Sequence, residues 1–297
     1  MSIVSWLVKK SFGRSDTARD AGLTTPEDII RYDDIRYGDD PVWQMLDVYR
    51  PRSAGKNPLP VIVSVHGGGW VYASKEVYQF YCMNLAQRGF AVVNFSYRLA
   101  PQYKFPAFLE DTNAVFCWVL DHADEYGFER DNIFAVGDSA GANILGLYSA
   151  VCTNPDYAAR FSFQHPAGFA PRAIALNCGT YRIDKKRMPP DLVRLLLPDF
   201  LPERGSAEEL RTIDVTEHIT SSFPPVFITT ANGDFLKAQA PILARKQKRS
   251  GVRFVYRCYG DPKNILGHVF HCDIKSSAAK QCNDEQCSFF MKLKEAL

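Results

Sequence analysis

Apolar residues along the chain fall into short continuous runs that alternate with longer segments of helical periodicity. The continuous runs are rich in β-branched and aromatic residues, which is typical of strands buried on both faces of a sheet. They cover residues 61–65, 90–95, 132–136, 173–176, 225–230 and 252–257. The helical segments cover residues 77–88, 107–126, 143–151 and 242–249, and the chain beyond residue 273. This alternation predicts a mostly parallel sheet with helices on both faces.

Three segments depart from this alternation. Residues 35–37 and 44–49 alternate apolar and polar side chains, which predicts two antiparallel strands at a sheet edge. Residues 180–222 interrupt the pattern with prolines, a leucine-rich run and a charged tail. We expect a single domain over residues 1–297, with a small helical cap formed by residues 1–40 and the insertion 180–222. Within the first of these segments, Thr25-Pro26-Glu27-Asp28 resembles the start of a helix.

Composition narrows the range of partners. The chain has 297 residues, of which 46% are hydrophobic and 23% charged, and its formal net charge is +2. This balance is typical of a globular protein and gives no electrostatic case for nucleic acid or an anionic membrane. No apolar run reaches the ~18 residues of a membrane span. Lys9 and Lys10 follow the first apolar run, the reverse of a secretory signal, so we expect a cytoplasmic protein.

Cysteine usage points away from disulfides and metals. The chain has 8 cysteines, several of them inside apolar runs, and no Cys-x-x-Cys pair. We therefore expect buried, reduced thiols. His268, His271 and Cys272 lie close together, but no second cluster completes a metal site. We therefore expect no metal.

The strongest chemical signal is Gly137-Asp138-Ser139-Ala140-Gly141, which reads Gly-x-Ser-x-Gly. A predicted strand precedes it and a predicted helix follows it. A sharp turn between a strand and a helix exposes the central serine at its tip, and the two glycines leave room for that turn. Ser139 is therefore the candidate nucleophile for acyl transfer.

A serine hydroxyl needs a base within hydrogen-bond reach and an acid that orients the base. After such a turn, the acid and then the histidine follow along the chain, each at the end of a strand. Asp234 and His268 occupy these places. Asp261 is a less favoured acid because it follows the last strand, and His271 is a rival base only three residues from His268.

The negative charge that develops during acyl transfer needs hydrogen-bond donors already in place. The N–H of Ala140, directly after the serine, is one candidate. His66-Gly67-Gly68-Gly69-Trp70 follows a buried strand and can turn several N–H groups into one cavity. We expect Gly67 and Gly68 to supply the other donors.

Taken together, the motifs resemble those of the hormone-sensitive-lipase family of α/β-hydrolase esterases, over residues 45–297. They are His66-Gly67-Gly68-Gly69-Trp70, Tyr97-Arg98-Leu99-Ala100-Pro101 with Phe105-Pro106-Ala107 and Asp111, and Gly137-Asp138-Ser139-Ala140-Gly141. The resemblance implies an α/β-hydrolase fold with a cap, a Ser139–Asp234–His268 triad and an oxyanion hole of Gly67, Gly68 and Ala140. It also implies that Tyr97, Arg98 and Asp111 act in the structure and not in the chemistry.

Two positions differ from the family pattern. After the acid, the family often has Asp-Pro-Leu and then Arg-Asp, whereas this chain has Asp234-Phe235-Leu236-Lys237-Ala238. The second carboxylate of the pattern is absent. At the base, His-Gly-Phe is common, whereas this chain has His268-Val269-Phe270, which keeps His271 open as an alternative.

The resemblance also extends to bacterial acetyl esterases. It implies hydrolysis of short-chain esters of small molecules, acetyl esters above all, through an acyl-serine intermediate, by an enzyme that needs no cofactor. One alternative is an arylformamidase-like amidohydrolase, which uses the same triad on an amide. A second is a non-catalytic small-molecule receptor on the same fold, which the presence of Ser139 and His268 disfavours. A homodimer through the last strand or the cap is left open.

Overall fold

The computed structural model describes residues 2–183 and 192–295. In these residues one eight-stranded sheet runs through the molecule in the order β1-β2-β4-β3-β5-β6-β7-β8. Strands β3 to β8 are parallel to one another, whereas β2 pairs antiparallel with both β1 and β4 at one edge. The predicted α/β architecture is confirmed.

The elements alternate along the chain as the hydrophobic pattern predicts. The strands are β1 (Ile29–Arg36), β2 (Met45–Pro51), β3 (Leu59–Val65), β4 (Ala91–Phe95), β5 (Phe128–Asp138), β6 (Ile174–Asn177), β7 (Val226–Ala231) and β8 (Phe254–Tyr259). The longer helices are α1 (Ile3–Asp20), α2 (Lys75–Ala86), α3 (Ala107–Asp121), α5 (Ala140–Thr153), α7 (Leu192–Phe200), α10 (Gln239–Arg249) and α11 (Ser277–Lys294). The short helices are α4 (Ala123–Tyr126), α6 (Pro155–Ala158), α8 (Ala207–Thr212) and α9 (Val215–His218).

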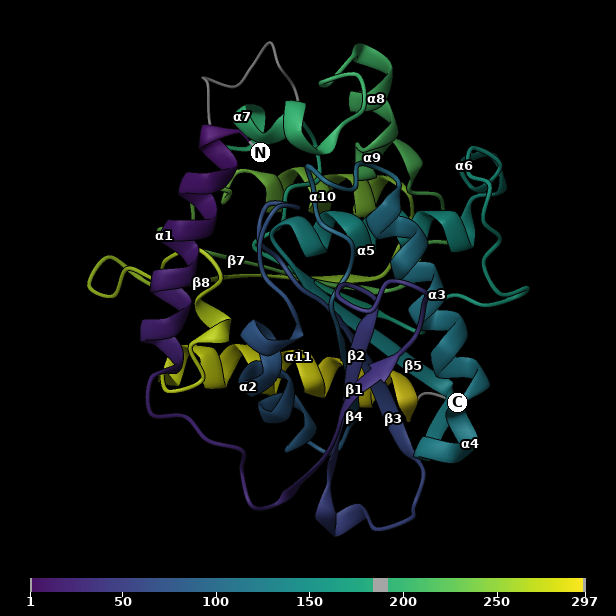
Figure 1. The fold of residues 1–297 in the computed structure, drawn as a ribbon, viewed down its shortest axis with the longest axis vertical. Coiled ribbons are helices and arrows are strands. Elements are labelled where there is room, and N and C mark those ends of the chain that lie inside the picture. Colours follow the sequence, from purple (N-terminus) through teal and green to yellow (C-terminus); the bar gives the residue numbers. More distant parts are fainter. Residues whose placement is uncertain (1, 184–191, 296–297) are drawn as a thin grey trace.

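Helices cover both faces of the sheet (Figure 1). The strand β3 shows how two cores arise, because its side chains alternate between them. Val61, Val63 and Val65 belong to the same hydrophobic core as side chains of α3, α5 and α10, whereas Ile62 belongs to the core that includes side chains of α2 and α11. A strand with both faces buried is apolar at every position, which explains the unbroken run in the sequence.

Residues 1–40 depart from the predicted cap. Thr25-Pro26-Glu27-Asp28 is followed by the strand β1 and not by a helix, because Ile29 pairs with Pro51 and Ile30 with Arg50 in the sheet. The capping resemblance was therefore misleading, since long-range pairing decides the local structure here. Residues 29–36 therefore belong to the sheet, whereas α1 lies outside it and stays a candidate for the cap.

The remaining cap candidates lie near one another. Ser2 and Ser5 at the start of α1 both donate hydrogen bonds to Asp199 of α7. Figure 1 shows α1 along one side of the molecule, with α7 beside its amino-terminal end. Part of the expected insertion, residues 184–191, lies outside the described residues. The division into one domain and a cap stays a prediction.

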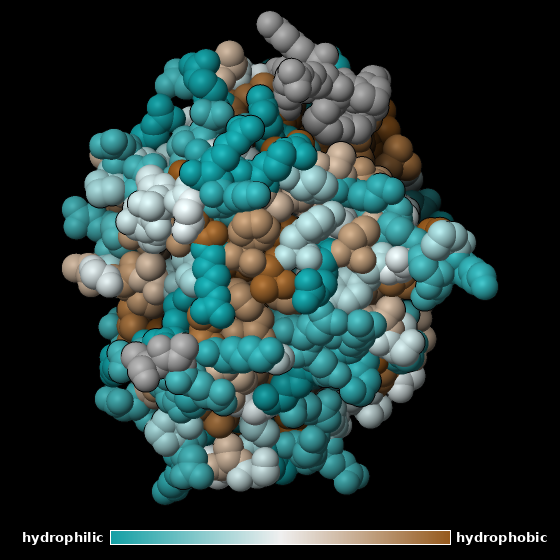
Figure 2. All heavy atoms as spheres, turned by 180° about the vertical axis from the view of Figure 1, so that it is seen from behind, coloured by the Kyte–Doolittle hydropathy of each residue, from teal (hydrophilic) through white to brown (hydrophobic). Residues whose placement is uncertain are grey.

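The opposite side of the molecule, shown in Figure 2, carries mostly hydrophilic side chains with apolar patches between them. Among the described helices, none is both long and apolar enough to span a bilayer.

Candidate active site

The candidate nucleophile Ser139 lies between the end of β5 and the start of α5. Its backbone φ of 52° is unusual for a residue with a side chain, as expected for a sharp turn between strand and helix. Gly141 makes the turn sterically feasible. A Cβ at this position would lie 2.0 Å from the carbonyl oxygen of Val65. The geometry therefore requires glycine here and presents the Ser139 hydroxyl at the end of the strand.

The predicted base His268 forms two hydrogen bonds, one to Ser139 and one to the predicted acid Asp234. The Nε2 atom of His268 lies 3.0 Å from the Ser139 Oγ. Its Nδ1 atom lies 2.7 Å from the Asp234 Oδ1. The three residues come from loops after three different strands, β5, β7 and β8. The structure thus brings together the residues that the chain order selected.

The Asp234 carboxylate is held by donors on both oxygens. Oδ1 also accepts the N–H of Leu236 at 2.9 Å, and Oδ2 accepts the hydroxyl of Thr230 at 2.9 Å. Burial alone raises the pKa of Asp234, but these bonds and the partnership with His268 outweigh it, and the net pKa lies below its ordinary value. The acid is therefore ionised and fixed where it can orient the imidazole.

The rival residues face other partners. Asp261 caps its own turn, since its Oδ1 accepts the N–H groups of Lys263 at 2.8 Å and Asn264 at 3.1 Å. His271 is fully buried, with its ring against Tyr81 and its Nε2 3.6 Å from the Cys272 sulfur. Burial lowers the pKa of His271 to about 3. Neither rival contacts Ser139.

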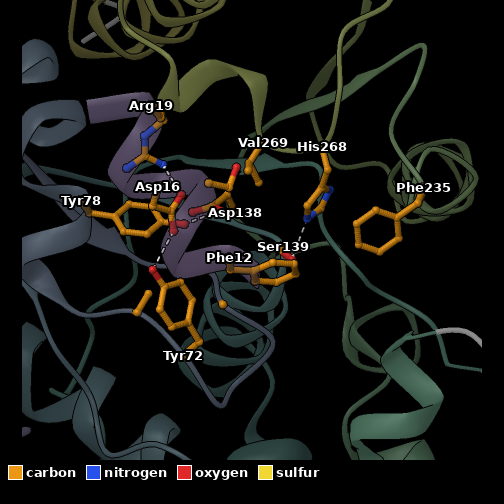
Figure 3. Close-up of a pocket in the computed structure, with 13 residues that line it drawn as sticks. Phe12, Asp16, Arg19, Tyr72, Tyr78, Asp138, Ser139, Phe235, His268 and Val269 are labelled. Carbon is orange, nitrogen blue, oxygen red and sulfur yellow. Dashed lines mark hydrogen bonds and ion pairs between the residues drawn. The ribbon is translucent and has the colours of Figure 1, made fainter. Parts of the chain in front are cut away.

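The loop after His268 is backbone-strained. Val269 has a φ of 51° and ψ of 32°, the left-handed region that glycine adopts freely. This is the position at which the family pattern has glycine and this chain does not. The ring of Phe235 lies on the side of the imidazole away from Val269 (Figure 3), and the centroids of the two rings are 4.3 Å apart. The imidazole is thus held between the strained loop and an aromatic ring.

The glycine loop differs in one respect from the prediction. The N–H of Gly67 already donates to the hydroxyl of Tyr78 at 3.0 Å, which argues against its role as an oxyanion donor. Within the described residues, the N–H groups of Gly68, Gly69 and Ala140 have no hydrogen-bond partner. All three residues line the pockets beside Ser139. In the part of the chain that the structure describes, the N–H groups beside Ser139 that are left without a partner thus belong to Gly68, Gly69 and Ala140, whereas that of Gly67 is engaged by Tyr78.

Two tyrosines support the glycine loop: Tyr78, which sequence reasoning did not assign, and Tyr97. The Tyr78 hydroxyl donates to Oδ2 of Asp138 at 2.7 Å. Burial raises the pKa of Asp138 to about 6, although the Tyr78 bond works against this rise. The ring of Tyr97 stacks on His66, and its hydroxyl donates to the His66 carbonyl at 2.9 Å. Tyr97 thus has the structural place that the family resemblance implied.

Arg98 and Asp111 likewise form a structural pair. Asp111 accepts the N–H of Arg98 at 2.7 Å and its Nε at 2.9 Å. The Asp111 side chain is buried, so the pair anchors the loop after β4 to α3.

The space beside Ser139 is divided into two unequal pockets. The larger, of about 210 Å³, contains His268, Asp138 and Tyr78 and is shown in Figure 3. The smaller, of about 20 Å³, is mostly apolar and contains Trp70, Leu196 and Leu236. Trp70 stacks on Phe200 of α7 with centroids 4.0 Å apart, which fixes this wall. The nucleophile therefore stands between a narrow apolar space and a wider polar one.

The helix α1 contributes one wall of the larger pocket, through residues that sequence reasoning did not single out. Phe12, Ser15, Asp16 and Arg19 line it from one helical face. Their spacing of three and four residues was a signal in the sequence, but it did not reveal where the helix would lie.

Two groups of side chains carry metal-ligand chemistry: Asp138, His271 and Cys272, and Cys178, Asp234 and His268. Burial raises the pKa of both thiols well above the ordinary value, so they are protonated at neutral pH. Asp138, Asp234 and His268 already have hydrogen-bond partners, and Asp234 and His268 are bound to each other within the candidate triad. The donor sets therefore fit a metal poorly, and the expectation of no metal and no cofactor stays a prediction.

Comparison with known proteins places this geometry in a family. The family described as alpha/beta hydrolase fold matches residues 62–271. The chain is similar to esterase LipC of Mycobacterium tuberculosis, with 31% identity over 201 residues, which are 67% of this chain and 47% of LipC. It is also similar to carboxylesterase NlhH of the same organism, with 27% identity over 274 residues, 89% of this chain and 84% of NlhH. The chain thus spans about half the length of LipC but most of NlhH.

Solved structures agree with this picture at the level of the fold. An inhibited esterase B from Lactobacillus rhamnosis superposes with a TM-score of 0.87 and 22% sequence identity. The superposition covers 99% of this chain and 97% of the other. The fold of this chain therefore recurs in a protein of distant sequence.

Proposed function

This chain belongs to the hormone-sensitive-lipase-like family of α/β hydrolases, and we propose that it is a carboxylic ester hydrolase that cleaves short-chain, above all acetyl, esters of small molecules. The observation that carries the proposal is the bond from His268 to both Ser139 and Asp234, at 3.0 and 2.7 Å, beside an open pocket. Relatives named as esterases support the same chemistry.

In this proposal Ser139 attacks the ester carbonyl and His268 Nε2 takes the hydroxyl proton. Asp234 holds the Nδ1 proton and stabilises the imidazolium that forms. The N–H groups of Gly68, Gly69 and Ala140 donate hydrogen bonds to the carbonyl oxygen as its negative charge develops. The imidazolium then gives its proton to the leaving alcohol. In the second half, water attacks the acyl-serine with His268 as the base, and the proton then passes to the Ser139 oxygen as the acid leaves.

The two pockets support the choice of a short acyl group. A space of about 20 Å³ lined by Trp70, Leu196 and Leu236 suits an acyl chain with one or two carbons beyond the carbonyl. The larger pocket of about 210 Å³ is left for the alcohol part. A long acyl chain would have to displace packed aromatic and leucine side chains, which is costly in a close-packed wall.

A series of p-nitrophenyl esters from acetate to decanoate tests the proposal. We expect kcat/KM to be highest for acetate or propionate, with a burst of p-nitrophenol that Ser139→Ala abolishes. A maximum at eight carbons or longer would overturn the acetyl preference. An absence of turnover with every activated ester would overturn the enzyme assignment and revive a receptor role. Faster cleavage of an N-formyl aromatic amine than of phenyl acetate would favour the arylformamidase alternative.

Location in the cytoplasm, assembly as a homodimer and the small cap remain predictions. Size-exclusion chromatography with light scattering would decide the oligomeric state.

A further inference from the structure

We propose that the wall formed by α1 binds hydroxyl groups on the alcohol part of the ester, with the Asp16 carboxylate as the principal acceptor. The inference rests on the proposed ester hydrolysis, because it concerns which esters the site prefers. It assigns the substrate class as partial esters of polyhydroxy alcohols.

The first support is the position of Asp16. Residues 12, 15, 16 and 19 lie on one face of α1 and line the same pocket as Ser139 and His268. Figure 3 shows Asp16 and Arg19 on the side of this pocket away from Phe235, with Asp138 and Tyr78 next to them. An ester bound with its carbonyl at Ser139 would therefore place its leaving alcohol next to Asp16.

The second support is that Asp16 is held in place before any ligand arrives. Its Oδ2 accepts the Tyr72 hydroxyl at 2.9 Å, and its Oδ1 accepts Arg19 Nη1 at 2.9 Å. Arg19 is itself fixed by Asp20, at 2.7 Å, and by the carbonyl of Val77, at 2.8 Å. Each carboxylate oxygen can accept a second hydrogen bond, and 22% of the Asp16 side chain is exposed. Asp16 is thus a preorganised acceptor with capacity left.

The third support is the contrast between the two pockets. The carboxylates of Asp16 and Asp138 and the guanidinium of Arg19 all lie in the larger pocket, whereas the smaller is lined mainly by apolar side chains. An apolar alcohol would leave these polar groups without partners once water is displaced, which costs free energy. A hydroxyl both donates and accepts, and so matches a wall that carries both kinds of group. A cationic alcohol would meet the carboxylates but would be repelled by Arg19.

The test compares two acetates that differ only in hydroxyl groups, glycerol 1-acetate and propyl acetate, with released acetic acid followed by titration. We expect the wild type to prefer glycerol 1-acetate by about tenfold in kcat/KM, as for one good hydrogen bond to a charged group. Asp16→Asn should remove most of this preference. Because the preference is the ratio of two substrates within one protein, a general loss of activity in the variant cancels from it.

Asp20→Asn is the matched control, because Asp20 binds the same Arg19 but does not line the pocket. We expect it to keep the preference. Equal loss in both variants would assign the effect to the anchoring of Arg19 and overturn the role of Asp16. No preference in the wild type would overturn the inference, whereas no hydrolysis of p-nitrophenyl acetate by the wild type would overturn the proposed function itself.

Two measurements on the wild type keep the test valid if Asp16→Asn does not fold. Glycerol should inhibit p-nitrophenyl acetate hydrolysis at lower concentration than 1-propanol, and equal inhibition would contradict the inference. The second compares 2-(dimethylamino)ethyl acetate with its uncharged counterpart 3-methylbutyl acetate. The preference for 2-(dimethylamino)ethyl acetate over 3-methylbutyl acetate is then compared with the preference for glycerol 1-acetate over propyl acetate. If the first is larger, the pocket is a cation site and the hydroxyl assignment is overturned.

Discussion

The hydroxyl of Tyr78 donates to the Asp138 carboxylate at 2.7 Å and accepts the N–H of Gly67 at 3.0 Å. Asp138 directly precedes Ser139, and Gly67 directly precedes Gly68. One buried hydroxyl therefore connects the turn that carries the nucleophile to the loop that carries the proposed oxyanion donors. The spacing between the N–H groups of Gly68 and Ala140 depends on this link.

Tyr78→Phe should lower kcat by about ten- to a hundredfold with little change in KM, because donors that are slightly misplaced still bind substrate but stabilise the transition state less. A phosphonate transition-state analogue should lose affinity by a similar factor. Tyr81→Phe is the control, since Tyr81 lies on the same helix and its hydroxyl contacts Gln286. Equal effects of both substitutions would point to a general packing role for Tyr78.

His268→Ala and His271→Ala should separate clearly in the same assay. His268 contacts Ser139 and Asp234, so its loss should lower kcat by about 10⁴-fold or more. His271 is buried behind it, so its loss should lower stability and leave kcat of the folded fraction within about tenfold. Thermal unfolding measured beside activity distinguishes the two effects. Comparable losses of kcat per folded molecule would contradict the choice of His268.

Much of this site was predictable because its chemistry depends on chain order and local sequence. The strand before Ser139, the glycines around it and the order Ser139, Asp234, His268 are all local features of the sequence. Each residue lies where a parallel strand ends, and such ends meet at one edge of the sheet. Hence a one-dimensional order was enough to select three residues that meet in space.

What the sequence did not show depends on contacts between distant segments. Nothing near Tyr78 marks its contact with Gly67, because that contact depends on how α2 packs against the glycine loop. Asp16 is an ordinary helical residue until α1 docks beside Tyr72. The strand β1 follows a sequence that resembles a helix start, because pairing with β2 outweighs the local preference.

Gly141→Ala should prevent or strongly weaken folding. The added Cβ would lie 2.0 Å from the Val65 carbonyl oxygen, a backbone atom that cannot move without shifting β3. We expect a loss of about 3 kcal/mol or more in the free energy of unfolding. Gly267→Ala is the matched control, because a Cβ there meets no atom within 4 Å. Urea unfolding of both variants checks the prediction, and similar stability of the two would show that the turn can relax.

Stability should fall as the pH is lowered from about 6.5 towards 4. Burial lowers the pKa of His66 to about 4 and of His271 to about 3, whereas an unfolded imidazole takes up its proton near pH 6.5. In this interval the unfolded chain therefore binds more protons, and acid favours it. Asp138 acts in the opposite direction, because burial raises its pKa to about 6 and the folded state is protonated first.

Between about pH 6 and pH 4, the unfolded chain binds two more protons than the folded protein on His66 and His271 and one fewer on Asp138. In net, the unfolded chain therefore binds one more proton. The free energy of unfolding should then fall by about 1.4 kcal/mol per pH unit from these three groups. His271→Gln should flatten this slope, and Asp138→Asn should make it about twice as steep. Urea unfolding of the three proteins at pH 7, 6, 5 and 4.5 measures the slopes. If His271→Gln leaves the slope unchanged, His271 is not a neutral buried imidazole in the folded protein.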